Sequence, residues 1–223
     1  MSTPVASQAR GGQLPRRRIP ARWIAVALAT ALLAAIGFST QYRPAESVAA
    51  GPRRFDPTVY GARTYEDKVV PVVERKAVEL PVLVRAMTDD MKGAEKQYGV
   101  RQGNGPYNFA VKGTGTAGAV ESGLMPVAVR GLPPHTRVSL QVGPVINGTA
   151  LRDVVGFITF EQFLNQVEYA DAATALNDQM REKLLKHLDA PGLKGKKISF
   201  VGAFSFLTPS VVTITPVSIK ETS

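Results

Sequence analysis

The segment Lys197–Phe206 (KISFVGAFSF) decides the fold, because large apolar side chains recur at every second position along it. A period of two is typical of a β-strand that buries one face. We therefore expect a half-buried strand here. Five residues share its predicted inward face: Ile198, Phe200, Gly202, Phe204 and Phe206.

The end of the chain continues this pattern in a second predicted strand. Val212 and Ile214 keep the alternation, and the phase changes at Pro216 to Val217 and Ile219. A proline combined with a change of phase indicates a bulge or an edge within the strand.

Two earlier segments show the same period of two. The turn residues Gly103–Pro106 and Leu132–Pro134 lie before them and favour reversals of the chain. Each segment predicts a strand with one buried face. The apolar residues on these faces are Tyr107, Phe109 and Val111 in the first and Val138, Leu140 and Val142 in the second.

The longest predicted helix lies between the two groups of strands. Thr159 and Gln162 form a capping-box pattern at its start, and Asp189–Gly192 contains the residues expected to end it. Its acidic residues lie early and its basic residues late, as the helix dipole favours. The expected apolar stripe consists of Phe160, Phe163, Val167, Ala170, Ala173, Leu176, Met180, Leu184 and Leu188.

Residues 55–99 predict helices that precede the strands. Asp56 is suited to cap the first helix, Pro57 to its first position, and Phe55 to pack on Tyr60. We expect a kink or break near Pro71, because proline has no amide hydrogen.

The helical pattern resumes through Lys76–Val78. Pro81 fits the first turn of a further stretch that runs through Met87 to Tyr98, where Gly99 ends it. The succession of strands, one long helix and two more strands predicts an α+β fold. We expect a small β-barrel plugged by the helix, similar to an OB-fold, with the N-terminal helices before it.

A basic and apolar N-terminus predicts export. Five arginines precede the apolar run Trp23–Phe38. Positive residues stay on the cytoplasmic side, so we expect residues 1–22 in the cytoplasm and the C-terminal part outside. Trp23 and Tyr42 bracket a stretch of roughly 30 Å as a helix, which matches the hydrocarbon core of a bilayer.

We therefore expect residues 23–42 to form an uncleaved transmembrane signal-anchor in the bacterial cytoplasmic membrane. Residues 43–54 would be a linker and residues 55–223 an extracytoplasmic, periplasmic domain. The alternative is cleavage after Ala49 or Ala50, where small residues fit a leader peptidase but lie far from Phe38. Arg17-Arg18 fits a twin-arginine signal poorly.

Composition excludes several classes of function. The sequence has no cysteine, which excludes disulfides, thiolate metal sites and a lipidated cysteine. The net charge of +9 belongs largely to residues 1–43, since residues 44–223 hold 21 basic and 18 acidic residues. No basic stripe with interleaved aromatic residues points to nucleic acid.

We find no catalytic pattern in the sequence. It contains no G-x-S-x-G motif, and His135 and His187 are expected to be surface residues in a turn and at a helix end. Gly113–Gly118 resembles a phosphate loop but lacks the following lysine, so we expect hairpin turns there. Asn147-Gly148 predicts a type I′ turn. We therefore expect no enzymatic activity, no cofactor and no metal.

One polar cluster is a candidate recognition site. Arginine and carboxamide groups can bind sugar hydroxyls or carboxylates, and a tyrosine can stack on a sugar ring. The alternative, which we favour, is that these side chains satisfy backbone groups and fix the entry of the long helix. The cluster consists of Arg152, Asp153, Asn165, Gln166, Glu168, Tyr169 and Asn177.

Several segments resemble a bacterial family of predicted envelope lipoproteins, domain of unknown function 2291. The resemblance is strongest in Gly143–Asp178, and it extends to Lys68–Leu83, Gly105–Gly115, Leu193–Phe204 and Ile214–Val217. It implies an extracytoplasmic domain without established activity, often encoded beside sugar-type ABC transporters. The missing cysteine departs from the lipoprotein pattern, so the segment Trp23–Tyr42 would replace the lipid as anchor.

These observations predict a membrane-tethered, non-enzymatic module of a solute-uptake system. Its expected partners are an ABC transporter permease or a solute-binding protein. The alternatives are an envelope hydrolase and a purely structural envelope protein.

Overall fold

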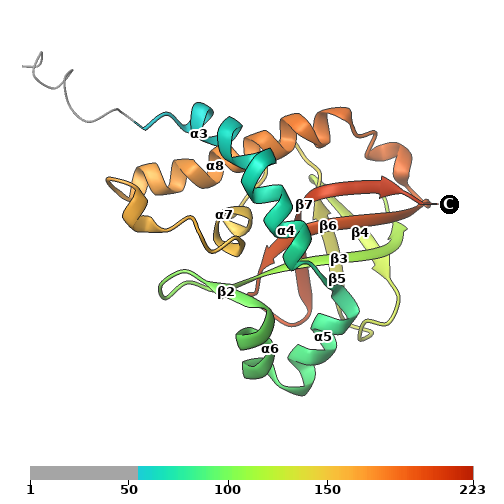
Figure 1. Ribbon diagram of the computed structural model, residues 1–223. Coiled ribbons are helices and arrows are strands. Elements are labelled where there is room, and N and C mark those ends of the chain that lie inside the picture. Colours follow the sequence, from blue (N-terminus) through green and yellow to red (C-terminus); the bar gives the residue numbers. More distant parts are fainter. Residues whose placement is uncertain (1–54, 223) are drawn as a thin grey trace, which may run out of the picture. The chain divides into compact units, whose positions relative to one another are not determined.

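Five strands close into a barrel in the computed structural model, which describes residues 55–222 (Figure 1). Their order is β3-β4-β5-β7-β6, and pairing of β6 with β3 closes the barrel. The β5–β7 pair is parallel, and the other pairs of the barrel are antiparallel. The strands are β3 (Tyr107–Ala117), β4 (Leu124–Val129), β5 (Arg137–Gln141), β6 (Lys197–Ser205) and β7 (Val211–Glu221).

The barrel interior contains the predicted inward residues. Phe200 and Phe204 of β6 are each 1% exposed, as the alternation predicts. The ring of Phe204 stacks on that of Phe109 from β3, with 5.6 Å between centroids. Val138 and Leu140 of β5 are buried in the same cluster. The period of two therefore identified the inner face of three barrel strands.

A bulge lies where β6 pairs with β7. Val201 pairs with Ser218 and Gly202 with Pro216, which leaves Val217 without a partner. Val217 faces a cluster outside the barrel, whereas Ile219 returns to the interior. The change of phase at Pro216 is confirmed, but the prediction that Val217 and Ile219 share a face is wrong.

The glycine-rich segment Gly113–Gly118 is not a pair of hairpin turns. Residues up to Ala117 belong to β3 and pair with both β4 and β6. A Cβ atom on Gly113 would lie 2.9 Å from the ring of Phe200. On Gly115 it would lie 2.6 Å from the Ala128 carbonyl oxygen. Glycine allows close packing within the barrel here. Because glycine is also typical of turns, the sequence alone does not distinguish the two roles.

The N-terminal helices begin as predicted and differ at Pro71. The Asp56 carboxylate accepts a 3.1 Å hydrogen bond from the Val59 amide, and the rings of Phe55 and Tyr60 are 5.3 Å apart. No break occurs near Pro71. A wider π-helical turn precedes the proline, which has no amide hydrogen for the regular pattern. The elements are α3 (Pro57–Thr64), the π-helix Tyr65–Val69 and α4 (Val70–Lys76).

Two further helices close one end of the barrel. Pro81 lies in the first turn of the first helix, and Gly99 follows the second, as expected. Leu80, Leu83 and Met87 belong to the interior cluster of the barrel. The sequence predicts this plugging role for the long helix, and that prediction is wrong. The elements of this region are β1 (Val78–Glu79), α5 (Leu80–Asp89), α6 (Met91–Tyr98) and β2 (Gly99–Arg101).

The long helix starts later than the sequence indicates. Thr159 precedes only a short 3-10 turn and makes no capping hydrogen bond. Asn165 is the true cap, since its side chain accepts a 2.9 Å hydrogen bond from the Glu168 amide. The helical elements here are α7 (Ala150–Val154), α8 (Gln166–Lys183) and the 3-10 turns Phe160–Gln162, Leu185–His187 and Pro191–Leu193.

Helix α8 packs outside the barrel. Leu176 and Met180 are fully buried against α7 and the outward residues Ala110, Ala203 and Val217. Figure 1 shows α8 with α3, α4 and α7 on one side of the strands, and α5 with α6 at another. The predicted stripe is correct in the centre of α8, but Val167 is 68% and Phe160 39% exposed.

Within residues 55–222, no helix has the length and apolarity needed to cross a membrane. The expected anchor, residues 23–42, and the expected linker, residues 43–54, lie outside the described residues.

Candidate ligand pocket and polar cluster

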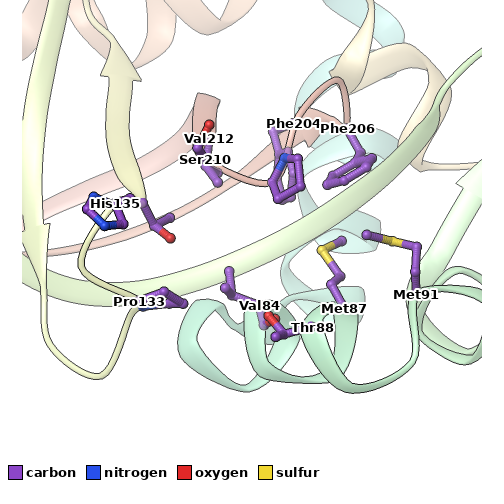
Figure 2. Close-up of a pocket in the computed structure, with 12 residues that line it drawn as sticks. Val84, Met87, Thr88, Met91, Pro133, His135, Phe204, Phe206, Ser210 and Val212 are labelled. Atoms are coloured by element: carbon purple, nitrogen blue, oxygen red, sulfur yellow. The ribbon is translucent and has the colours of Figure 1, made fainter.

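An apolar pocket lies at the barrel end that α5 and α6 close. Its volume is about 360 Å³, within the range of small-molecule sites. Figure 2 shows Met87 and Met91 pointing from the helices toward Phe204 and Phe206. Twelve residues line it: Val84, Met87, Thr88, Met91, Pro133, His135, Thr136, Phe204, Phe206, Pro209, Ser210 and Val212.

The helical wall of the pocket follows from the spacing of residues 84–91. Val84, Met87 and Thr88 are three and four residues apart, so they share one face of α5. Met91 starts α6 just after the break at Asp90. Methionine side chains are flexible and polarizable and adapt to apolar ligands of varied shape.

The opposite wall comes from the strands and their loops. Phe204 is the last buried aromatic of β6, and Phe206 follows two residues later in the β6–β7 loop. The Phe206 amide donates a 2.8 Å hydrogen bond to the Tyr107 carbonyl, which fixes this loop to β3. The rings of Phe206 and Phe109 meet edge to face with centroids 6.5 Å apart.

The polar groups of this pocket do not form a catalytic arrangement. The Thr88 hydroxyl donates a 2.9 Å hydrogen bond to the Val84 carbonyl and is therefore engaged within α5. His135 and Ser210 are exposed, and among the described residues no hydrogen bond connects them. A ligand in this pocket would therefore be held mainly by apolar contacts.

The predicted polar cluster has a buried ion pair at its centre. Arg152 Nε lies 2.7 Å from Asp153 Oδ1, and each side chain is 8% exposed. Arg152 also donates a 2.9 Å hydrogen bond to the Tyr169 carbonyl, and its guanidinium lies 3.5 Å from the centroid of the Tyr169 ring. The Thr149 hydroxyl donates to Asp153 Oδ2 at 2.6 Å. The ionic groups are thus satisfied inside the domain.

Tyr169 connects this ion pair to a group of aromatic rings. Burial raises the pKa of the Tyr169 hydroxyl, and the nearby Asp153 carboxylate raises it further. That hydroxyl lies 3.4 Å from Asp153 Oδ1. The ring contacts Phe160 and Phe163, with centroids 5.7 and 5.5 Å away. The Tyr169 ring thus contacts one guanidinium and two aromatic rings, which leaves little of it to stack on a sugar.

The other members of the cluster lie along α8. Asn177 donates a 2.9 Å hydrogen bond to the Gly148 carbonyl and fixes the loop before α7. Glu168 accepts a 3.0 Å hydrogen bond from the Leu164 amide, and Asn165 caps the helix. Gln166 is exposed in the first turn. The structure thus brings Arg152, Asp153 and Tyr169 together and distributes the other four. A binding role for the cluster stays a prediction.

The turn at Asn147-Gly148 is not of type I′. Gly148 has a φ of +100°, but Asn147 does not have the positive φ that type I′ requires. Gln141 holds the Asn147 backbone by two hydrogen bonds of 2.9 and 3.0 Å. The loop therefore leads into α7 rather than forming a hairpin.

Sequence reasoning missed the apolar pocket. The spacing of Met87 and Met91 and the position of Phe206 beyond the buried strand were the available signals. The sequence analysis places Phe206 on the inward face of a strand and assigns no site to the two methionines, because nothing in the sequence indicates that a space remains between these side chains. In residues 55–222, no group of three or more metal-ligating side chains occurs. His135 and His187 are exposed, as predicted.

Comparisons with known proteins agree with this architecture. The crystal structure of an OB-fold protein from Thermotoga maritima matches with a TM-score of 0.63. It covers 76% of this chain and 100% of its own chain at 18% identity, so the likeness concerns the fold. No curated protein matches. The model of the predicted periplasmic lipoprotein family, domain of unknown function 2291, matches residues 26–220, and the chain therefore belongs to this family.

Proposed function

We propose that this protein is a non-catalytic binding domain of the cell envelope that serves a sugar-type ABC uptake system as an accessory or ligand-sensing component. Residues 23–42 would hold it in the cytoplasmic membrane. The family supports an extracytoplasmic location. The observation that carries the binding role is the apolar pocket of about 360 Å³ between α5, α6 and two barrel loops.

The chemistry of this pocket favours an apolar ligand. Two methionines and two phenylalanines form its walls, and the hydroxyl of Thr88 is already hydrogen-bonded to the Val84 carbonyl. Sugar hydroxyls would lose hydrogen bonds to water without replacement in such a site. We therefore assign any carbohydrate specificity of the system to the partner proteins, and the sensing of an apolar compound to this domain.

The alternative functions lack comparable support. A hydrolase needs an activated nucleophile, and residues 55–222 contain no histidine hydrogen-bonded to a serine or threonine hydroxyl. A purely structural protein would not require an open apolar space beside its core, since interiors normally pack without large voids.

A variant with a filled pocket tests whether the pocket binds a ligand. The experiment uses the full-length protein in lipid nanodiscs. A photoreactive alkyl diazirine is the probe, and cross-linked peptides are mapped by mass spectrometry. We expect labelling of α5, α6 and the β6–β7 loop. Met91→Trp should abolish this labelling by filling the space, whereas Met91→Leu should preserve it. Equal labelling of all three proteins, or none in α5 and α6, would reject the pocket as a binding site.

We expect the permease or solute-binding protein to bind near the turn at Asn147-Gly148. A groove there is lined by the loop before α7 and by the β6–β7 loop. Val145 is 69% and Leu207 78% exposed beside it, whereas Arg152 and Asp153 are buried. We expect a Val145→Asp and Leu207→Asp double variant to lose co-purification of the permease or solute-binding protein at an unchanged melting temperature. Retained co-purification would reject this surface.

A further inference from the structure

An apolar patch is exposed around the start of α8. Leu164 and Val167 are 69% and 68% exposed, and Phe157 and Phe160 are 38% and 39% exposed. We call these four residues the rim patch. They lie within twelve consecutive residues, and the two aliphatic side chains precede or occupy the first turn of the helix. Two aromatic and two branched side chains in water are costly unless something covers them.

The rim patch adjoins the point where the described chain begins. The ring of Phe55, the first described residue, lies 5.3 Å from that of Phe163. Phe163 contacts Tyr169, and Tyr169 contacts Phe160 of the patch, at 5.5 and 5.7 Å. Three successive ring contacts thus connect the N-terminal residue of the domain to the exposed patch. Figure 1 shows α3 and the start of α8 at the same end.

The sequence places the apolar segment 23–42 only twelve residues before Phe55. A flexible linker of that length has a mean span of about 20 Å and a maximum of about 40 Å. Anchorage by residues 23–42 would therefore keep Phe55, and the patch beside it, close to the bilayer. A nearby surface has a high effective concentration, so even weak apolar contacts would be populated.

We propose that the rim patch inserts into the interface of the outer leaflet of the cytoplasmic membrane and thereby orients the barrel. This inference rests on the proposed tether. The patch segment from Gly156 to Val167 contains no lysine or arginine and carries the exposed Glu161. Its membrane contact is therefore driven by apolar burial and does not depend on anionic lipid. We favour lipid over a protein partner, because the anchor would keep the rim patch beside the bilayer at all times.

The single tryptophan of the chain, Trp23, allows a sharp test. Full-length protein is reconstituted in phosphatidylcholine vesicles with brominated or plain acyl chains, and tryptophan fluorescence is compared. The reporter is Leu164→Trp in a Trp23→Phe background. The matched control is Val82→Trp in the same background, since Val82 is 52% exposed on α5 and lines neither the apolar pocket nor the groove proposed as partner surface. Melting temperatures verify that both variants fold.

We expect bromolipid quenching and a blue shift for Leu164→Trp, neither for Val82→Trp, and no change on adding phosphatidylglycerol or salt. The wild-type protein reports the tether separately through Trp23. Quenching of Trp23 without quenching at position 164 would reject membrane insertion of the rim patch and support anchorage by residues 23–42. Quenching at position 164 alone would support the patch and reject the tether. If position 164 responds only when permease is added, the patch is a protein interface and the proposal is wrong.

Discussion

Gly115 is constrained by the neighbouring strand, and Asp153 is constrained by a buried ion pair. A Cβ atom on Gly115 would lie 2.6 Å from the Ala128 carbonyl oxygen of the neighbouring strand. Asp153 holds the guanidinium of Arg152 and the hydroxyl of Thr149 with almost no solvent access. The contact of Gly115 leaves no local signal, which is why the sequence predicts a turn there. The burial of Asp153 is not visible in the sequence either, so the sequence allows both a recognition role and the structural role that we favour.

Gly115→Ala should destabilise the domain by about 1–3 kcal/mol, because the added methyl group must displace backbone of β4. Intrinsic strand propensity alone would favour the substitution. Thermal unfolding followed by circular dichroism measures the effect. Thr116→Ala is the control, since its side chain is exposed on the same strand. Equal stability of the two variants would show that β3 does not pack against β4 as described.

Asp153→Ala should destabilise the domain by about 3–5 kcal/mol, because it leaves the buried Arg152 charge without its partner. Asp178→Ala is the matched control. Its pair with Arg181 is on the surface, so its loss should cost less than about 1 kcal/mol. Denaturant titration of both variants gives the comparison. If Asp153→Ala is as mild as Asp178→Ala, the ion pair contributes little and a recognition role for Asp153 gains support.

At the scale of elements, the sequence predicts the interiors of helices and strands better than their ends. The alternation from Ile198 to Phe204 and the centre of α8 were predicted correctly, because a long buried face imposes a period. The start of α8 was placed at Thr159 instead of Asn165. Both positions offer a capping residue followed three residues later by Gln or Glu, so the local chemistry is ambiguous. The structure distinguishes them, because only Asn165 makes a capping hydrogen bond.

Asn165→Ala should lower the stability of the domain by about 1 kcal/mol, because the Glu168 amide loses its capping hydrogen bond. Thr159→Ala should have a smaller effect, since Thr159 caps no helix. The melting temperatures of the two variants rank the caps directly. The reverse order would place the functional start of the helix at Thr159 and contradict the structure.

At the scale of the whole molecule, the order of elements was sufficient to predict an OB-like barrel, and the structure confirms it. The prediction that the long helix closes the barrel is wrong, because the apolar stripe of a helix does not indicate which surface the helix packs against. The apolar pocket could not be predicted either. Its walls come from α5, α6, β6, β7 and two loops, and the lining residues lie up to 128 positions apart, from Val84 to Val212.

Retention of the N-terminal segment is the prediction that concerns the whole chain. If residues 23–42 are an uncleaved anchor, intact-mass analysis of the membrane fraction should give the full 23.9 kDa chain. The bracketing of the apolar run by Trp23 and Tyr42 is the reason for this expectation. A mature species that begins at Ala50 or Gly51 would reject the anchor.

The position of β7 between β5 and β6 has a consequence for how the protein is made. Export presents a polypeptide to the envelope gradually, with its N-terminus first, and β7 is the final strand to emerge. Until Val211–Glu221 arrives, β5 and β6 each expose an edge that another chain could extend. If the domain is exported as an unfolded chain, there is therefore an interval in which its own fold does not yet protect those edges.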